Sequence, residues 1–163
     1  MAFHNRKPTR KRDFDYAQDG SYFVTICSNA RKNLFSNIPN KQDLESAAVC
    51  LSSIGEVAEK HIKQIHERFP HTTVDAYVIM PNHIHLLISI INRDDTPPKK
   101  LSVVIGTFKS LVSCECKRKY NSNAIFQTSF HDRIIRDSDE YEKVLNYIIH
   151  NPGNWLFDCF YAE

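Results

Sequence analysis

The stretch VIMPNHIHLLI, residues 78–88, places a Pro-Asn pair between two runs of apolar residues. Proline and asparagine are common turn residues, so the pattern predicts a β-hairpin whose strands cover residues 72–80 and 83–91. Alternate residues of a strand point to opposite faces, so His83 and His85 share one face and the apolar residues between them share the other. We expect the apolar face to pack against the core, so the histidine face remains available for chemistry.

The segments on both sides of this hairpin alternate between strand-like and helix-like patterns. Runs rich in β-branched and aromatic residues predict strands, and apolar residues at three- and four-residue steps predict helices. The expected order is β, α, β, β, α, β, α, with strands at residues 22–28, 72–80, 83–91 and in the second half of 125–136, and helices at 41–69, 101–120 and 137–151.

Local signals mark the ends of the predicted helices. Pro70 ends the first helix and Pro152 ends the third, because proline cannot continue a helix. Asp137 and Glu140 have the spacing of a capping box, which predicts the start of the third helix. Gly55 is the candidate break within the long first helix.

The first six elements match the split ferredoxin-like pattern. We therefore expect an α+β fold with an antiparallel sheet flanked by helices, and an additional helix near the C-terminus. No internal repeat and no long linker divides the chain. The expected organisation is a basic N-terminal arm at residues 1–19 followed by one domain at residues 20–163.

The amino-acid composition and the cysteine spacing argue against several classes of protein. The chain has 163 residues, 42% of them hydrophobic and 25% charged, which is typical of a soluble globular domain. Its longest nearly apolar run, residues 86–91, is far shorter than the roughly 18 residues of a membrane span. The charged N-terminus does not resemble a secretory signal. Five cysteines without zinc-type spacing favour neither a disulfide framework nor a zinc finger. We expect a cytoplasmic protein without membrane contact.

Positive charges are clustered in two places although the net charge is only +2. One cluster lies in the N-terminal arm, and the other, residues 117–119, lies at the end of the second predicted helix. Such clusters suit a phosphate backbone, because neutralising phosphates releases condensed counterions. The alternatives are a solvated basic tail and, for the second cluster, a favourable interaction with the helix dipole. The cations of the N-terminal arm stand in a segment without a single acid and are Arg6, Lys7, Arg10, Lys11 and Arg12.

The histidine pair and the third helix carry candidate functional groups. The Cβ atoms of His83 and His85 are about 7 Å apart on a strand, so two neutral imidazoles can converge on one cation; two hydrogen-bonded structural histidines are the alternative. On the third helix, Tyr147 lies about 120° from the middle of the apolar stripe, and Asn151 follows one turn later on the same side. A phenol and a carboxamide there can serve as nucleophile and metal ligand. The alternative is a boundary tyrosine in contact with water.

Four segments, MPNHIHLL, GTFKS, FQTSFHDRIIR and YIIHNP, together resemble the single-tyrosine HUH transposases. More narrowly, the chain resembles the IS200-like group and its branch associated with repetitive extragenic palindromes (REP), over about residues 20–155. In that family two histidines flanking a hydrophobic residue bind a divalent ion, and His83 and His85 match them. The family's nucleophile matches Tyr147. Its third ligand matches Asn151, where the insertion-sequence branch usually has Gln, and Asn before Pro is similar to the REP-associated branch.

One departure concerns the geometry of Asn151. A residue before proline is pushed away from helical dihedrals, so we expect Asn151 at a C-cap.

The resemblance implies a metal-dependent transesterase that cleaves and rejoins single-stranded DNA at hairpin-forming sequences through a 5′-phosphotyrosine. Mg²⁺ or Mn²⁺ at His83, His85 and Asn151 would polarise the scissile phosphate, and Tyr147 would attack it. The base that activates the phenol is not identified; Lys143, one turn earlier, is a candidate for favouring the phenolate. The expected partner is hairpin DNA in the nucleoid. Relatives include both dimers and monomers, so a monomer or a homodimer is expected.

Further cations and two rival functions complete the expectations. Lys109, Arg133 and Arg136 are weaker candidates for phosphate contacts than the arm, and His131 is expected to be structural.

One rival function is a domesticated hairpin DNA-binding protein without cleavage activity. The other is a metal-dependent hydrolase of nucleotides or phosphate esters, in which water attacks. The intact set of two histidines, tyrosine and asparagine argues against both rivals.

Overall fold

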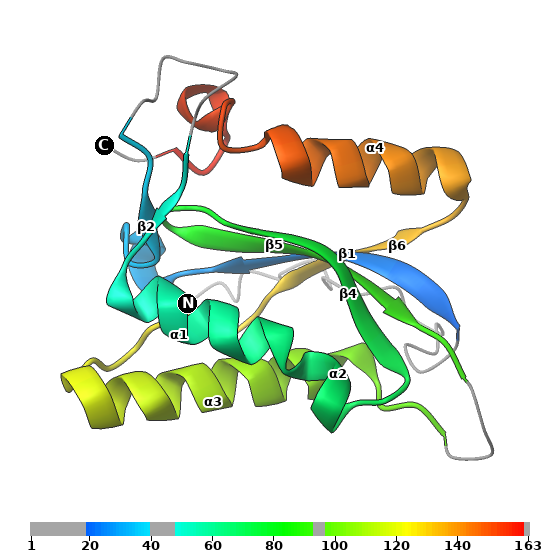
Figure 1. The fold of residues 1–163 in the computed structure, drawn as a ribbon, viewed down its shortest axis with the longest axis horizontal. Coiled ribbons are helices and arrows are strands. Elements are labelled where there is room, and N and C mark those ends of the chain that lie inside the picture. Colours follow the sequence, from blue (N-terminus) through cyan, green and yellow to red (C-terminus); the bar gives the residue numbers. More distant parts are fainter. Residues whose placement is uncertain (1–18, 40–47, 93–96, 162–163) are drawn as a thin grey trace, which may run out of the picture.

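A four-stranded antiparallel sheet lies at the centre of the computed structural model, which describes residues 19–39, 48–92 and 97–161 (Figure 1). The strands occur in the spatial order β4-β5-β1-β6, and each neighbouring pair is antiparallel. This is the order of the ferredoxin-like fold, which confirms the predicted α+β class. The four strands are β1 (Gly20–Cys27), β4 (Thr72–Ile79), β5 (His83–Ile90) and β6 (His131–Ile135).

Helices cover both faces of the sheet. In Figure 1, α1 (Ser53–Lys63), α2 (Ile65–Arg68) and α3 (Leu101–Tyr120) lie on one face, and α4 (Ser138–His150) lies on the other. None of the helices in the described ranges has the length and apolar character of a membrane span. The remaining elements are short: 3-10 turns η1 (Asn29–Arg31) and η2 (Trp155–Phe157), and a second sheet of β2 (Ser36–Asn37) and β3 (Cys50–Leu51).

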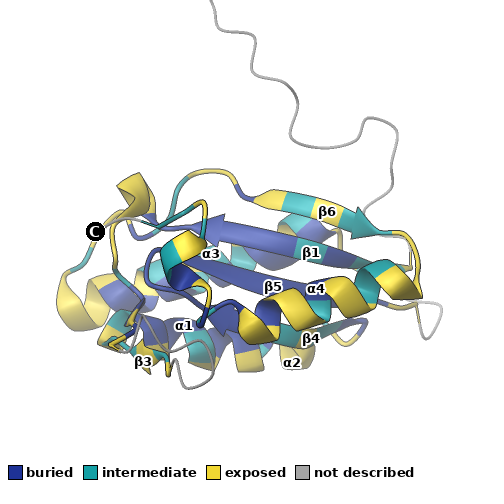
Figure 2. Ribbon diagram, turned by 90° about the horizontal axis from the view of Figure 1, so that it is seen from above, coloured by how far each residue is buried: buried dark blue, intermediate teal, exposed yellow. Residues whose placement is uncertain are grey.

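Each face of the sheet has its own hydrophobic core, because side chains alternate along the strands. Residues such as Val24, Ile84 and Leu86 face α1 and α3 and form the larger core. Leu87 faces α4 and packs with Val144 in a smaller core. Figure 2 shows buried strands beneath α4, whose outward side is exposed. The histidine face of β5 is therefore the α4 face.

The predicted hairpin is confirmed to within one residue at each strand end, and the second helix occupies the predicted residues. The third helix also begins as predicted, because the Asp137 side chain accepts a hydrogen bond from the Glu140 N–H at 2.8 Å. The Glu140 carboxylate reaches back to the N–H of Arg136, one residue before the cap. Local patterning was sufficient for these elements because their signals lie within the elements themselves.

The prediction of one helix over residues 41–69 is wrong. Residues 40–47 lie outside the described part, and the described chain forms β3 before α1 begins. Ser52 is the N-cap: its N–H donates to the Phe35 carbonyl at 2.9 Å, and its hydroxyl accepts from the Gly55 N–H at 3.1 Å. A contact with a residue far away in the sequence therefore determines where the helix begins.

Gly55 does not break the helix, which changes direction instead at Gln64, between α1 and α2. A Cβ atom at Gly55 would lie 2.0 Å from the Phe35 carbonyl oxygen. The glycine is thus required by a close approach of two backbones in the first turn of α1.

Asn151 is the C-cap of α4, as expected, but the expected departure from helical dihedrals is wrong. Its φ of −58° and ψ of −40° are right-handed helical. The chain continues in tight turns: Asn154 N–H bonds the Asn151 carbonyl at 3.1 Å, and Trp155 N–H bonds that of Pro152 at 3.3 Å. These bonds, with the burial of the Asn151 side chain, offset the steric preference of a residue before proline.

Candidate active site and metal centre

The histidine pair lies deep beneath α4 and the C-terminal segment, which we define as residues 155–161. His83 is 0% and His85 is 1% exposed. Their ring centroids are 4.5 Å apart, because both side chains point to the same face of β5. The predicted convergence of the two imidazoles is therefore present.

Hydrogen bonds around His83 determine which nitrogen carries its proton. Asn82 donates through Nδ2 to the Phe160 carbonyl at 2.7 Å, which turns its Oδ1 toward His83. His83 Nδ1 lies 2.9 Å from that oxygen and must donate to it. The lone pair of His83 Nε2 is then free, and this buried nitrogen has no hydrogen-bond partner among the described residues. This tautomer is the one that a metal ligand requires.

Both histidines are neutral at physiological pH. Burial lowers the pKa of His83 to about 3, and the positive charge of Arg31 acts in the same direction. Burial and the neighbouring His83 lower the pKa of His85 to about 3. Neutral imidazole is the form that binds cations.

The phenol of Tyr147 reaches the pair from α4. Its hydroxyl lies 3.4 Å from His85 Nε2, while His85 Nδ1 lies 2.9 Å from the Thr25 hydroxyl. Phe23 packs edge-on against the Tyr147 ring at 5.8 Å, and its ring lies 4.9 Å from that of His85 at a tilt of 30°. Tyr147 is nevertheless 44% exposed, so a substrate can approach it from solvent.

In the described state Tyr147 is a protonated phenol. Burial raises its pKa, and the negative charge of Asp158 raises it further, against a smaller opposing effect of the Asn151 side chain. Lys143, the candidate for favouring the phenolate, is exposed one turn earlier on α4. A positive charge beside the neutral histidines, such as a bound cation, would be needed to lower the pKa of Tyr147.

Asn151 offers a second unpartnered acceptor. The residue is 2% exposed, and its Nδ2 donates to Asp158 Oδ2 at 3.3 Å. Its Oδ1 is buried and, like His83 Nε2, has no hydrogen-bond partner within the described ranges. Buried acceptors are normally satisfied, so both atoms are candidate ligand atoms for a cation.

Asp158 is a site residue that sequence reasoning missed. Its side chain is 2% exposed, and Oδ2 lies 3.9 Å from His83 Nε2, while Oδ1 accepts from the Phe160 N–H at 2.7 Å. Ligand atoms of His83, His85 and Asp158 all lie within 4.8 Å of one another. The available signal was an isolated acid in the aromatic run WLFDCFY, residues 155–161.

This donor set fits a divalent cation. Two neutral imidazoles, an amide oxygen and a carboxylate suit Mn²⁺, and the oxygen donors also suit Mg²⁺. A cation held by His83, His85 and Asp158, whose ligand atoms lie within 4.8 Å of one another, would satisfy the unpartnered His83 Nε2 and would balance the Asp158 charge.

The C-terminal segment covers His83 from solvent. The centroids of the Phe160 and His83 rings lie 4.7 Å apart, and the Arg31 guanidinium lies over the Phe160 ring at 5.0 Å from its centroid. Trp155, 1% exposed, packs at 6.0 Å from His83. Tyr147, by contrast, is 44% exposed and lies on a side of the site that solvent reaches.

Lys109 is already engaged within the protein. Its ammonium donates to the carbonyls of residues 127, 128 and 129 at 2.6, 2.9 and 3.3 Å, and burial lowers its pKa. These three bonds use all three ammonium hydrogens. Lys109 thus holds the loop before β6 and has no hydrogen left for a phosphate.

The other predicted cations differ in their positions. Arg133 and His131 pair with Phe23 and Thr25 across β1, so they lie on the same sheet face as the histidine pair, and both are exposed. Arg133 forms an ion pair with Glu140 at 2.6 Å. Arg136, also exposed, follows β6. The arm residues Arg6, Lys7, Arg10, Lys11 and Arg12 lie outside the described residues.

Comparisons with known proteins show which family the chain belongs to. The family profile described as "Transposase IS200 like" matches residues 16–151. An uncharacterized protein of Haemophilus influenzae is 29% identical over 177 residues, covering 98% of this chain and 95% of the relative. Another protein of that organism, named as a REP-associated tyrosine transposase, is 30% identical over 165 residues, covering 91% and 84%.

Two solved structures share the fold. A REP-associated tyrosine transposase bound to a REP hairpin superposes with a TM-score of 0.59 at 20% identity, covering 93% of this chain and 73% of that one. A protein of Deinococcus radiodurans, named as a transposase, gives a TM-score of 0.51 at 12% identity, covering 88% and 98%.

Proposed function

The chain belongs to the IS200-like transposases, a family of DNA-cleaving and DNA-rejoining enzymes, and we propose that it cuts single-stranded DNA at hairpin-forming sequences through Tyr147. The observation that carries the proposal is the position of the Tyr147 hydroxyl, 3.4 Å from His85 Nε2, on a residue that is 44% exposed. A nucleophile there can reach a phosphate that also contacts the histidine pair. We include Asp158 in the site.

Four side chains would hold the cation. His83 supplies Nε2, Asn151 supplies Oδ1, and His85 and Asp158 complete the set. Bound there, Mg²⁺ or Mn²⁺ would supply Lewis acidity that polarises a non-bridging oxygen of the scissile phosphate. Asn82 orients His83 for this task, and Thr25 orients His85.

Tyr147 performs the transesterification. Its oxygen forms a bond to phosphorus while the bond from phosphorus to the 3′-oxygen breaks, leaving a 5′-phosphotyrosine and a free 3′-hydroxyl. The ester keeps the energy of the broken bond, so attack by a 3′-hydroxyl rejoins DNA and releases the phenol. The phenol loses one proton on attack and the leaving 3′-oxygen takes up one, so the step releases no net proton. Loss of the phenol proton requires a positive charge that outweighs the effects of burial and of Asp158 on the pKa of Tyr147.

Hairpin DNA is the proposed substrate, by analogy with the relative bound to a REP hairpin. Exposed Arg133 and His131 lie on the sheet face next to Tyr147 and are proposed to contact the strand there, with Arg136 and the cations of the arm as further contacts. We propose that the protein acts in the nucleoid as a monomer or a homodimer.

The test of this function is Tyr147→Phe with an end-labelled hairpin and Mn²⁺ or Mg²⁺. The variant should form no covalent adduct on a denaturing gel and should bind the hairpin within about twofold of the parent, because only the nucleophilic oxygen is removed. Tyr141→Phe on the same helix is the matched control and should retain adduct formation. Adduct formation by Tyr147→Phe would exclude Tyr147 as the nucleophile.

The same assay separates the two rivals. Hairpin binding by the parent protein with no adduct in either metal would support the DNA-binding rival. Metal-dependent turnover without an adduct, retained in Tyr147→Phe, would support the hydrolase.

A further inference from the structure

One half of the sheet face that carries the histidine pair is open. The α4 helix packs over β4 and β5, and Figure 2 shows β6 uncovered at the edge of the sheet, with β1 between β6 and α4. The Tyr147 ring packs edge-on against Phe23 of β1, so the tyrosine points from α4 toward this open half. A DNA strand held at Tyr147 would therefore lie over β1 and β6.

His131 lies across the open half from Tyr147. His131 pairs with Thr25 of β1, and Thr25 pairs with His85 of β5, so these three residues form one row across the same face of the sheet. The backbones at the two ends of the row are two strand spacings apart, about 10 Å. The Tyr147 hydroxyl, 3.4 Å from His85 Nε2, marks one end of the row, and the His131 side chain marks the other.

The two ends of this row suit the two oxygens of the reaction. In phosphoryl transfer the attacking and leaving oxygens lie roughly in line, on opposite sides of phosphorus. When the Tyr147 oxygen attacks from the α4 side, the 3′-oxygen leaves toward β6 and His131. A sugar oxygen is a poor leaving group without a proton, and a positioned acid typically speeds such a step by about 10²–10⁴-fold. A proton is therefore needed on the side where His131 lies.

The His131 side chain is available for this transfer. It is exposed, and among the described residues it makes no hydrogen bond or ion pair. Histidine is the side chain that most often acts as a general acid or base. Arg133, also exposed on this face, is paired with Glu140 at 2.6 Å, and a guanidinium does not give up its proton.

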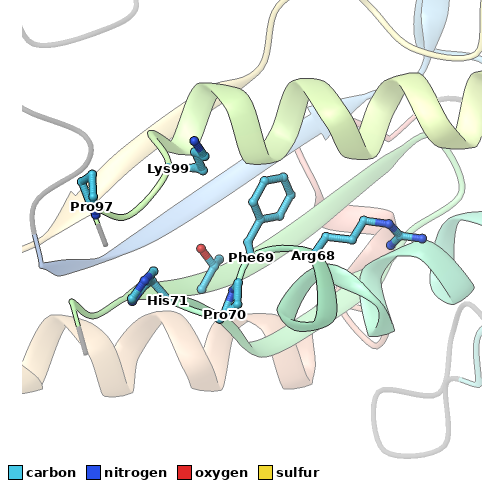
Figure 3. A pocket seen from close by; sticks show the side chains of 7 residues that line it. Arg68, Phe69, Pro70, His71, Pro97 and Lys99 are labelled. Atoms are coloured by element: carbon cyan, nitrogen blue, oxygen red, sulfur yellow. The ribbon is translucent and has the colours of Figure 1, made fainter. Parts of the chain in front are cut away.

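The other histidines within the described ranges lie away from the leaving oxygen. The pair on β5 is assigned to the cation, and His150 belongs to α4, on the side of the attacking oxygen, where its Nδ1 lies 2.8 Å from the Asn146 carbonyl. His61 and His66 belong to α1 and α2, on the opposite face of the sheet. His71 lines a cavity of about 180 Å³ at the far end of the sheet, between the turn after α2 and the residues that precede α3 (Figure 3).

The backbone that leads into His131 is held firmly. Lys109 of α3 donates to three carbonyls of the preceding loop at 2.6, 2.9 and 3.3 Å. The Gln127 N–H donates to the Cys27 carbonyl at 3.0 Å, and Phe130 is buried in the larger core. A catalytic group on such a fixed strand end keeps its position while the DNA strand binds.

From this arrangement we propose that His131 is the proton donor to the leaving 3′-oxygen, a role that rests on the proposed function of Tyr147. As the Tyr147 oxygen bonds to phosphorus and the bond from phosphorus to the 3′-oxygen breaks, the protonated imidazole gives its proton to the 3′-oxygen and becomes neutral. The phenol proton passes to solvent, and His131 recovers a proton from solvent. In rejoining, neutral His131 takes the proton of the attacking 3′-hydroxyl, and the departing phenolate of Tyr147 recovers one from solvent.

A hairpin with sulfur in place of the 3′-oxygen at the scissile phosphate tests this role. A thiol has a pKa of about 8.5, so a sulfur leaving group needs little help from an acid. With the oxygen substrate and Mn²⁺, His131→Asn should lower the rate of adduct formation at least about 100-fold, while it binds the hairpin within about twofold of the parent. With the sulfur substrate, the same variant should react within about threefold of the parent.

Arg133→Gln is the matched control, because Arg133 is exposed on the same strand and face as His131. It should lower adduct formation by the same factor on both substrates. An equal loss on both substrates in His131→Asn, or no loss on the oxygen substrate, overturns the role of His131 alone. If the parent protein forms no adduct with either substrate, the proposed function of Tyr147 fails, and the role of His131 fails with it.

Rejoining provides a second measurement. The parent and His131→Asn first form the adduct from the sulfur substrate, and the released thiol strand is then replaced by a strand with an ordinary 3′-hydroxyl. The acid of the forward step acts as the base of the reverse step, so His131→Asn should rejoin this strand at least about 100-fold more slowly than the parent. Equal rejoining rates would show that His131 does not carry the proton of the 3′-oxygen.

Discussion

Asp158 places a buried carboxylate beside two neutral imidazoles and the side chain of Asn151. If it is a cation ligand, Asp158→Asn should lower the affinity for Mn²⁺ by at least about tenfold, a loss seen even for groups that only orient ligands. Electron paramagnetic resonance titration of free Mn²⁺ measures this without any DNA. Asp139→Asn, which removes an exposed carboxylate of α4, is the matched control. Equal affinities would mean that Asp158 only holds Asn151 and Phe160 in place.

The histidine pair also predicts how stability depends on pH. Burial lowers the pKa of His83 and His85 from 6.5 to about 3. The unfolded chain therefore binds more protons than the folded protein between these values, so stability is fully present above pH 6.5 and falls as the pH falls. The slope should approach roughly 1.4 kcal/mol per pH unit for each histidine.

Urea unfolding at pH 7, 6 and 5 tests this expectation. The double variant His83→Gln/His85→Gln should lose most of the slope. A residual slope is expected from His61, whose pKa is lowered by burial against the opposing effect of Glu115. Lys119 and other partners hold the pKa of Glu115 at about 2, so Glu115 adds to the slope of stability with pH only below about pH 4.5. A flat profile in the parent protein would contradict the argument.

The sequence predicts the position of a single functional residue only when a periodic pattern shows on which face of a strand or helix the residue lies. Strand alternation pairs His83 with His85, and helical spacing sets Tyr147 and Asn151 on one side of α4. Asp158 belongs to a segment without periodicity, and it reaches the histidines only because tight turns after Asn151 fold the chain back. No local rule contains that reversal.

Among the elements, α1 depends on a backbone contact that a side chain would block. A Cβ at Gly55 would lie 2.0 Å from the Phe35 carbonyl oxygen, whereas a Cβ at Gly106 in α3 meets nothing within 4 Å. Gly55→Ala should therefore destabilise the protein by more than about 1 kcal/mol, and Gly106→Ala should stabilise it by up to about 1 kcal/mol, the helix propensity difference. Thermal unfolding of both variants gives the comparison. Similar effects of the two substitutions would mean that the Phe35 contact relaxes.

The same contact explains why the first helix was predicted too long. Apolar residues continue at helical spacing through residues 44–51, so periodicity alone extends the helix. The Ser52 N–H bonds the Phe35 carbonyl instead, 17 residues earlier in the chain. Long-range pairing of this kind overrides local preference, whereas α4 carries its own start and stop signals in Asp137 and Pro152.

Over the whole molecule, the two faces of the sheet are unequally supported. The α3 helix buries seven residues, while α4 buries only Val144 and Ile148. On the larger side, Glu115 of α3 also joins α1 through Lys60 at 2.9 Å and His61 at 2.9 Å. The proposed catalytic tyrosine therefore sits on the thinner layer, over a well-supported sheet.

This asymmetry predicts the pattern of native-state hydrogen exchange. Amides of α4 should exchange at least about tenfold faster than those of α3, because fewer buried contacts must open to expose them. Mn²⁺ should slow exchange in α4, since Asn151 at its end would share a ligand with the histidines of β5, and should leave α3 unchanged. Exchange read by NMR or mass spectrometry with and without Mn²⁺ tests both parts. Equal protection of α4 and α3 in the metal-free protein would show that the outer layer opens only with the whole fold, and the tyrosine would then be held rigidly before metal or DNA binds.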